Sequence, residues 1–305
     1  MTPSKSRGSL RSRPRRFEFV LETLVRLCGY SAILFVVLIF VFLLVEGLPA
    51  LAEIPLSSLL GSRWYPIEEM YGLLPLILGS VVVTLGAAMI AIPLGLATAV
   101  FIAEISPRWL REFLKPIVEI LAGLPSVVLG FLGILVLVPL VQTTLNLPTG
   151  LTAFTGSILL AGMALPTIVS VAEDALDSVP RSYRDGALAL GATRWQTIWR
   201  VILPAAKSGV LTAIMLGLGR AIGETMAVMM VTGNAAQIRL DLLFAPARTM
   251  TATVAAEMGE VASGSAHYHV LFLIGIVLFL ISFLVNIIAS SMLFRAKKRA
   301  ERMLS

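Results

Sequence analysis

The apolar residues of this chain gather into long runs that are separated by shorter polar segments. A bilayer core of about 30 Å needs about 20 helical residues to cross it. The runs therefore predict an all-α membrane protein with six transmembrane helices, at residues 27–45, 73–102, 116–141, 151–172, 208–232 and 269–293. Pro93 and the sequence Gly123-Leu124-Pro125 interrupt the second and third runs, where we expect kinks or local unwinding on surfaces that face protein.

The first apolar run also fits a signal peptide, because basic residues precede it and Ala50-Leu51-Ala52 follows it. The pair Arg15-Arg16 before Phe17 is similar to a twin-arginine signal. The run is longer than the roughly 7–15 apolar residues of a signal peptide, so we expect a retained membrane span.

The charge distribution assigns sides to these spans. Only 14% of the residues are charged and 57% are hydrophobic, whereas a soluble domain carries about a quarter charged residues. A net charge of +6 would suit nucleic acid, but the basic residues flank apolar spans, with no aromatic residues among them to stack on bases. With an inside N-terminus, the outside segments hold only Arg63, Arg239 and Arg248. The inside segments hold both terminal clusters and Arg26, Arg108, Arg111, Lys115, Arg181, Arg184, Arg194, Arg200 and Lys207.

Under the positive-inside rule, both termini and the loop before the fifth span are cytoplasmic. We therefore divide the chain into a basic cytoplasmic tail (1–26), a six-span membrane domain (27–295) and a basic cytoplasmic C-terminus (296–305). The single cysteine, Cys28, excludes an internal disulfide.

The stretch RDGALALGATRWQTIWRVILP, residues 184–204, places charges and two tryptophans between apolar runs. We expect a short helix at residues 185–190, with Gly191 ending it in a left-handed conformation. Thr193 and Gln196 predict a capping box that starts a second helix. Pro204 ends this helix and suits the first position of the next span. The second helix has one apolar stripe, formed by Trp195, Ile198, Trp199 and Ile202. Such a segment could simply lie in the lipid headgroups.

Its spacing resembles the EAA loop of ABC-importer permeases, which reads Glu-Ala-Ala, three residues, Gly, nine residues, Ile-x-Leu-Pro. The matching positions here are Asp185, Gly186, Ala187, Gly191, Val201, Leu203 and Pro204, with Asp for Glu, Gly for the first Ala and Val for Ile. The resemblance implies a cytoplasmic coupling helix that sits in a groove of a separate ATPase. The chain itself has no Gly-Lys dipeptide and hence no phosphate-binding loop, so it is not the ATPase. Because it carries one such loop where these transporters have two, a second permease subunit is implied.

Arg220 and Glu224 lie in the middle of the fifth run. A charge at this depth costs at least about 2.5–3.5 kcal/mol, so it normally faces protein or water. The i, i+4 spacing would let the two side chains meet on one helix face. They could be an ion pair that stabilises the bundle. Alternatively, Arg220 could bind a tetrahedral oxyanion on a transport path. Glu224 would then weaken the binding of the anion so that it can leave.

Three stretches resemble phosphate-specific ABC permeases of the PstC type: residues 119–133, 217–234 and 249–286, the second reading GLGRAIGETMAVMMVTGN. This resemblance implies ATP-driven inward phosphate transport across a bacterial or archaeal cytoplasmic membrane. It implies as partners a PstA-type permease, two ATPase subunits and an extracytoplasmic phosphate-binding protein. It also associates Arg220 and Glu224 with transport, and it implies a transport subunit without cofactor, rather than an enzyme.

Other functions remain open at this point. The substrate could be another oxyanion, such as molybdate, sulfate or phosphonate. An ion-coupled secondary transporter or channel could use Arg220 and Glu224 alone, although the halves show no convincing self-similarity and that class leaves the EAA-like loop unexplained. A regulatory membrane anchor is a third possibility.

Several further residues are candidates for smaller roles. His267 and His269 lack the carboxylate or cysteine support of a metal site, so we expect none. Gly123, Gly130 and Gly133 are expected to permit close helix packing. The Pro125-Ser126 pair could expose backbone groups to a passing anion.

Overall fold

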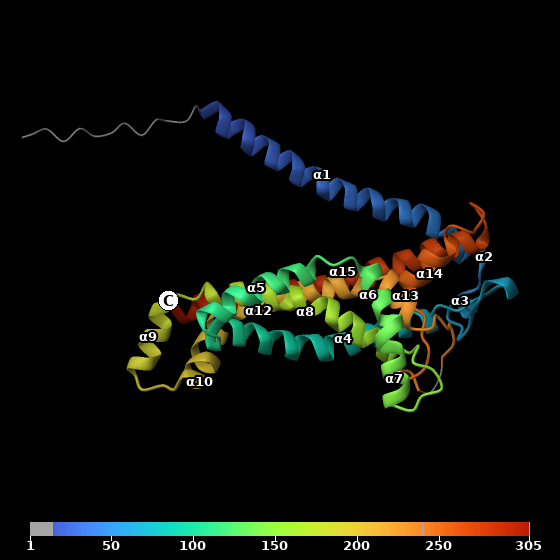
Figure 1. Ribbon diagram of the computed structural model, residues 1–305. Coiled ribbons are helices and arrows are strands. Elements are labelled where there is room, and N and C mark those ends of the chain that lie inside the picture. The colour runs from blue at the N-terminus through green and yellow to red at the C-terminus, as the bar shows by residue number, and fades with distance from the viewer. Residues whose placement is uncertain (1–14, 239–240, 305) are drawn as a thin grey trace, which may run out of the picture.

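The computed structural model describes residues 15–238 and 241–304, so the N-terminal basic cluster before Arg15 lies outside the described residues. Five long helices run along a common direction and form the body of the molecule (Figure 1). They are α4 (Leu74–Val100), α5 (Arg108–Ala122), α8 (Ala153–Asp177), α12 (Lys207–Ile222) and α15 (Ala266–Leu304).

Shorter elements gather at the two ends of this bundle (Figure 1). One end, here called the α9 end, carries α9 (Arg181–Ala189), α10 (Arg194–Thr197) and α11 (Leu203–Ala205). The other, the hairpin end, carries α2 (Pro49–Glu53), α3 (Leu56–Leu59), the antiparallel strands β1 (Trp64–Tyr65) and β2 (Met70–Tyr71), and α14 (Met250–Glu257). Three further helices lie nearer the hairpin end: α6 (Ser126–Leu132), α7 (Val138–Thr144) and α13 (Met226–Val231). Short π-helical turns occupy Phe101–Ile105, Gly133–Leu137 and Ile198–Ile202, and a 3-10 turn occupies Pro66–Glu68.

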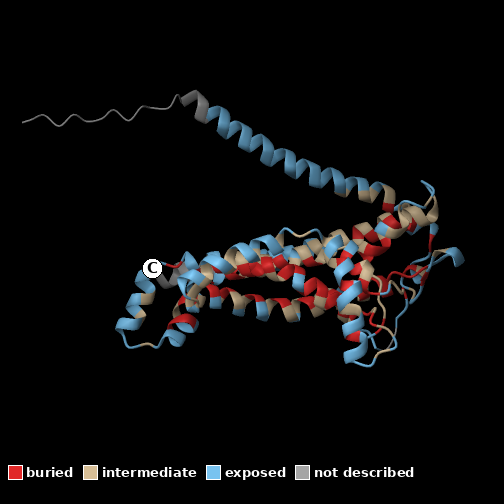
Figure 2. Cartoon of the chain, in the orientation of Figure 1, coloured by how far each residue is buried: buried red, intermediate tan, exposed pale blue. Residues whose placement is uncertain are grey.

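Helix α8 is the centre of the bundle and packs against α4, α5 and α12. Small residues make this packing close: a Cβ atom on Gly95 of α4 would lie 2.7 Å from Cγ2 of Ile168. Helix interfaces in membranes favour such small residues, because backbones can then approach each other. Buried residues follow α4 and α8 along the bundle (Figure 2).

Helix α1 (Arg15–Gly47) diverges from the bundle (Figure 1). Near its C-terminal end it packs on α15, where Phe40 stacks on Phe279 with ring centroids 4.6 Å apart. Residues 19–39 are exposed and mostly apolar. In a membrane, this surface requires lipid or another subunit to cover it.

The expected set of membrane spans agrees with these helices. In the described part of the chain, five helices are long and apolar enough to cross a membrane by themselves, and six if the bent pair Arg194–Ala205 and Lys207–Ile222 counts as one. The third span breaks at residues 123–125 as predicted, but its apolar helix starts at Ser126 rather than at residue 116. Local unwinding does not occur at Pro93, because α4 continues through it, and Pro93 is exposed rather than facing protein as expected.

Candidate transport and coupling sites

Two helices are interrupted near the middle of the bundle. Helix α5 ends at Ala122 and α6 begins at Ser126, while α12 ends at Ile222 and α13 begins at Met226. In the first break, Pro125 supplies no backbone N–H and adopts an extended conformation. The carbonyl groups at each helix end lose their helical partners, so polar backbone is available at both breaks.

Arg220, in the last turn of α12, joins these two breaks. Its Nη1 donates to the carbonyl oxygen of Ala122 at 3.0 Å and lies 3.4 Å from Oγ1 of Thr167. Thr167 lies near the midpoint of α8, which places the guanidinium at mid-bundle. A cation is favourable beside a helix C-terminus, because the free carbonyl groups carry partial negative charge.

Glu224 lies in the second break and points elsewhere. Its Oε1 accepts a hydrogen bond from the backbone N–H of Ala227 at 3.3 Å, and its carbonyl oxygen accepts one from Oγ1 of Thr251 at 3.1 Å. The expected meeting of Arg220 and Glu224 on one helix face is therefore wrong: no ion pair joins them in the described structure. The physical reason is that α12 ends at Ile222, so the four-residue spacing no longer spans one helical turn.

A small cavity adjoins Glu224. Its polar lining consists of the hydroxyl groups of Ser80, Thr84, Thr249 and Thr251 together with Glu224. Hydroxyl groups both donate and accept hydrogen bonds, so this lining can bind water. Arg220 does not line the cavity, so the two candidate transport residues have different surroundings.

The predicted close packing of glycines is confirmed for two of three positions. A Cβ atom on Gly130 would lie 2.8 Å from Cα of Ala227, and one on Gly133 would lie 2.8 Å from Cγ1 of Val231. Both glycines thus let α13 approach the third span. Gly123 has no neighbour closer than 3.5 Å, so the prediction is wrong there.

The segment that resembles an EAA loop has the predicted local structure. Helix α9 starts at Arg181, four residues before the expected start, and Gly191 has a left-handed φ of 81°. The capping box forms: the Gln196 N–H donates to Oγ1 of Thr193 at 3.2 Å, and the Thr193 N–H donates to Oε1 of Gln196 at 3.0 Å. Asp185 and Gly186 are exposed, and Ala187 is half-buried.

The expected apolar stripe of the second helix divides in two. Ile198 and Ile202 are buried, whereas Trp195 and Trp199 remain more than half exposed and meet edge to face. Leu203 and Pro204 belong to α11, and a bend of 74° separates this part from α12. Pro204 is therefore not the first residue of the next span, which begins at Lys207.

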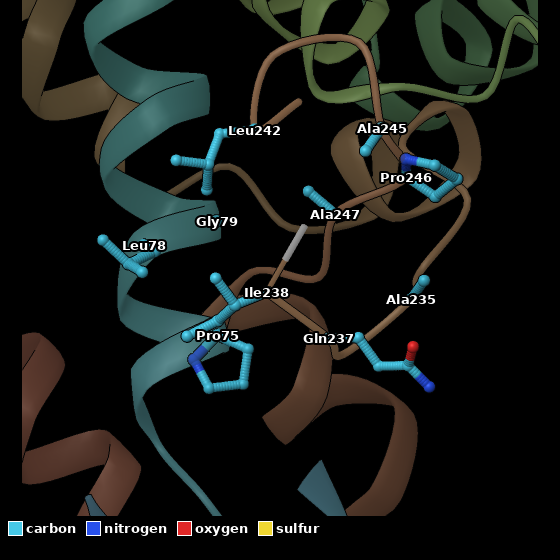
Figure 3. A pocket seen from close by; sticks show the side chains of 10 residues that line it. All are labelled: Pro75, Leu78, Gly79, Ala235, Gln237, Ile238, Leu242, Ala245, Pro246 and Ala247. Atoms are coloured by element: carbon cyan, nitrogen blue, oxygen red, sulfur yellow. The ribbon is translucent and has the colours of Figure 1, made fainter. Parts of the chain in front are cut away.

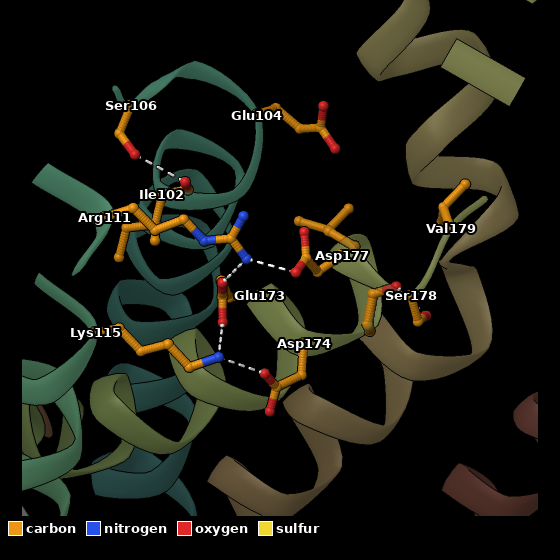
Figure 4. A network of polar contacts seen from close by, with 12 residues as sticks. Ile102, Glu104, Ser106, Arg111, Lys115, Glu173, Asp174, Asp177, Ser178 and Val179 are labelled. Carbon is orange, nitrogen blue, oxygen red and sulfur yellow. Dashed lines mark hydrogen bonds and ion pairs between the residues drawn. The ribbon is translucent and has the colours of Figure 1, made fainter. Parts of the chain in front are cut away.

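An ion-pair network at the α9 end was not predicted from the sequence (Figure 4). Glu173 of α8 is almost fully buried and accepts from Arg111 Nη2 at 2.5 Å and from Lys115 Nζ at 2.8 Å, both on α5. Arg111 and Lys115 also reach Asp177 and Asp174 at 2.7 Å each. Glu173 and Asp177 lie one helical turn apart, and this spacing in the sequence could have indicated the ion-pair network.

A family model described as "Binding-protein-dependent transport system inner membrane component" matches residues 91–298, which is more than half of the chain. The chain belongs to this family. The predictions of a multi-pass membrane permease and of a transport subunit rather than an enzyme are thereby confirmed.

Two relatives extend the likeness beyond the matched region of this permease. The "Probable ABC transporter permease protein YqgH" of Bacillus subtilis (strain 168) is 42% identical over 266 residues, covering 86% of each chain. The "Phosphate transport system permease protein PstC" of Mesorhizobium japonicum is 39% identical over 269 residues, covering 82% of each chain.

Solved structures agree on the fold of the permease. A chain of a bacterial ABC transporter "involved in the import of the acidic polysaccharide alginate" superposes with a TM-score of 0.62 over 92% of this chain and 99% of that one. A chain of the MetNI methionine ABC transporter, in an inward-facing conformation, superposes with a TM-score of 0.60 over 76% and 99%. At 16% and 19% identity these likenesses concern the fold alone.

The hairpin end of the permease holds a partly buried carboxylate, that of Glu257. Glu257 accepts hydrogen bonds from Trp64 Nε1 at 3.1 Å and Arg248 Nη2 at 2.6 Å, and lies 2.8 Å from His267 Nε2. His269 Nδ1 lies 2.8 Å from the carbonyl oxygen of Glu46. Both histidines thus bond protein groups, and no cluster of three potential metal ligands occurs in the described chain.

A small pocket lies beside the start of α4 at the same end (Figure 3). Gln237 supplies the one polar side chain of its described lining, which is otherwise formed by residues such as Pro75, Leu78 and Leu242. This apolar pocket offers no charge that would hold an anion.

Proposed function

We propose that this permease is a subunit of an ATP-driven ABC importer for inorganic phosphate. Two observations support phosphate: the relative named as a phosphate transport permease at 39% identity, and the arginine at mid-bundle. Arg220 is the observation that supports a transport path through the middle of the bundle. A charge at this depth is costly, and the described partners of Arg220 are neutral. The cytoplasmic membrane of a bacterium or archaeon is the proposed location.

Arg220 and Glu224 are the proposed transport residues. The guanidinium bonds a backbone carbonyl and a hydroxyl group, which are weaker partners than a carboxylate. An oxyanion entering at the breaks would offer a charge-assisted, bidentate partner in their place. Glu224, beside the hydroxyl-lined cavity, would keep such an anion from binding too tightly.

The segment at the α9 end is the proposed docking site for the ATPase. Its proposed coupling residues are Asp185, Gly186, Ala187, Gly191, Leu203 and Pro204. Leu190 is 91% exposed and two tryptophans of this segment are more than half exposed, which suits a surface that a partner covers. Two ATPase subunits would dock here and on a PstA-type second permease, and an extracytoplasmic phosphate-binding protein would dock at the hairpin end.

The proposed orientation has both termini and α9 in the cytoplasm. The described ends of α1 and α15 both point toward the α9 end, which supports one common side (Figure 1). The lysine and arginine asymmetry of the loops supports the cytoplasmic choice.

Reconstitution of the complete importer in liposomes tests this function. We expect ATP-dependent accumulation of labelled phosphate that requires the binding protein and that excess sulfate, molybdate or phosphonate does not suppress. Accumulation of one of these other oxyanions instead would replace phosphate by that substrate. ATP-independent uptake by the permease alone would support a secondary transporter.

The docking assignment has a separate test in Gly191. Its left-handed φ excludes a β-branched side chain without strain, so Gly191→Val should misplace α10. The ATPase should then co-purify poorly, whereas Gly186→Ala, at a site with open space around its Cβ position, should have a smaller effect. Normal co-purification and normal phosphate-stimulated ATP hydrolysis of Gly191→Val would contradict the assignment.

A further inference from the structure

Arg184 of α9 turns its side chain toward the bundle. Its Nε lies 3.2 Å from each carboxylate oxygen of Glu104, and its Nη2 lies 2.5 Å from Oε1 of Glu104. The remaining donors reach backbone: Nη1 donates to the carbonyl oxygen of Val179 at 2.5 Å, and Nη2 to that of Leu176 at 2.9 Å. One guanidinium therefore connects three parts of the α9 end.

The chemistry of this junction requires an arginine. Leu176 lies in the last turn of α8 and Val179 just beyond its end, and a cation beside the carbonyl groups of a helix C-terminus is favourable. Only a planar guanidinium can bond both oxygens of Glu104 and two carbonyl groups together. The hydrogen bond to Glu104 raises the pKa of Arg184 above its usual value despite the opposite effect of burial. Glu104 is 9% exposed and Arg184 20%, so water competes little with these bonds.

The helices held by this junction lead to the candidate transport site. Helix α8 carries Thr167 nine residues before Leu176, a distance of about 14 Å along a helix. Helix α5 is fixed to α8 by the ion pairs of Glu173, and its last residue is Ala122. Both oxygen atoms that Arg220 contacts therefore belong to helices that are bonded, directly or through Glu173, to the junction.

We propose that Arg184 and Glu104 form a clamp that transmits movement of α9 to α4 and α8, and through them to the surroundings of Arg220. The clamp rests on the proposed function, because a separate ATPase has to move α9. Arg184 is a positioning residue in this account and touches no substrate. Without the clamp, α9 moves relative to α4 when the ATPase binds nucleotide. Its movement is then not transmitted to the breaks around residues 123–125 and 223–225.

The first test measures phosphate transported per ATP hydrolysed by the complete importer in liposomes. Arg184→Lys keeps the charge but loses the planar fork, so we expect this ratio to fall at least about tenfold. Glu104→Gln keeps the bonds from Arg184 to the carbonyl groups of Leu176 and Val179 and should lower the ratio less. Arg181→Lys is the matched control, since Arg181 is exposed on the same helix and has no ion pair in the described structure. A wild-type ratio in Arg184→Lys, or loss of ATPase co-purification in every clamp variant, would overturn the clamp.

The second test does not depend on the substrate. Spin labels on Ser182→Cys in α9 and Leu94→Cys in α4, in a Cys28→Ala background, report the distance between these helices in the assembled importer. Nucleotide should leave this distance unchanged with Arg184 present and change it in Arg184→Lys. A nucleotide-dependent change of equal size in both proteins overturns the clamp, and so does an unchanged distance in both. If the distances behave as expected but no phosphate is taken up, the clamp stands and the proposed substrate is wrong.

Discussion

Charged groups meet different surroundings at the α9 end and at mid-bundle. At the α9 end, Glu173 binds two cations, and the Arg184 guanidinium binds the carboxylate of Glu104 as well as two backbone carbonyl groups. At mid-bundle, the described partners of Arg220 are a backbone carbonyl and a distant hydroxyl group. Saturated charges hold helices in place, whereas a charge with weak partners can exchange them for a ligand.

Two carboxylates, Glu173 and Glu224, offer the sharpest test of this difference. Glu173→Gln leaves Arg111 and Lys115 without their shared partner, so we expect a loss of about 3 kcal/mol in the free energy of unfolding. Glu224→Gln removes no ion pair and should cost no more than about 1 kcal/mol. Denaturant titration of the purified permease in mixed micelles measures both. Equal losses for the two variants would contradict the proposed difference between the α9 end and the middle of the bundle.

The mid-bundle breaks should depend on packing more than on charge. Gly130→Leu forces a side chain against Ala227, so we expect a loss of about 2 kcal/mol in the same titration. Gly123→Ala is the matched control, because its new Cβ would meet nothing closer than 3.5 Å. If Gly123→Ala is as destabilising as Gly130→Leu, the breaks are not held by the contact with α13.

Thr167 should make the smallest contribution. Its hydroxyl lies 3.4 Å from Arg220 Nη1, which is long for a hydrogen bond, so Thr167→Val should cost about 0.5 kcal/mol or less. The ion-pair partner Lys115→Met serves for comparison and should cost more. A larger loss for Thr167→Val would mean that Arg220 is held as firmly as the charges at the α9 end.

Local features of the chain were predictable from its sequence, and contacts between distant segments were not. The turn at Gly191 and the capping box of Thr193 and Gln196 involve residues within one helical turn, and both form as expected. The break at Gly223 was missed, because no proline marks it, whereas Pro125 marks the break in the third run. The bond between Arg184 and Glu104 joins positions 80 residues apart, which no local pattern reveals.

Uptake of labelled phosphate by variants of Arg220 and Glu224 tests the central claim, that the weakly bound charges at mid-bundle are the transport residues. The variants are Arg220→Lys and the apolar pair Arg220→Met with Glu224→Leu, compared at matched membrane abundance with co-purification of the partner subunits as the control for assembly. We expect assembled importers whose phosphate uptake is lost in the double variant and strongly reduced in Arg220→Lys, because a lysine lacks the planar donor fork. Normal uptake by the assembled double variant would contradict the claim, and failure of every variant to assemble would give these residues a structural role.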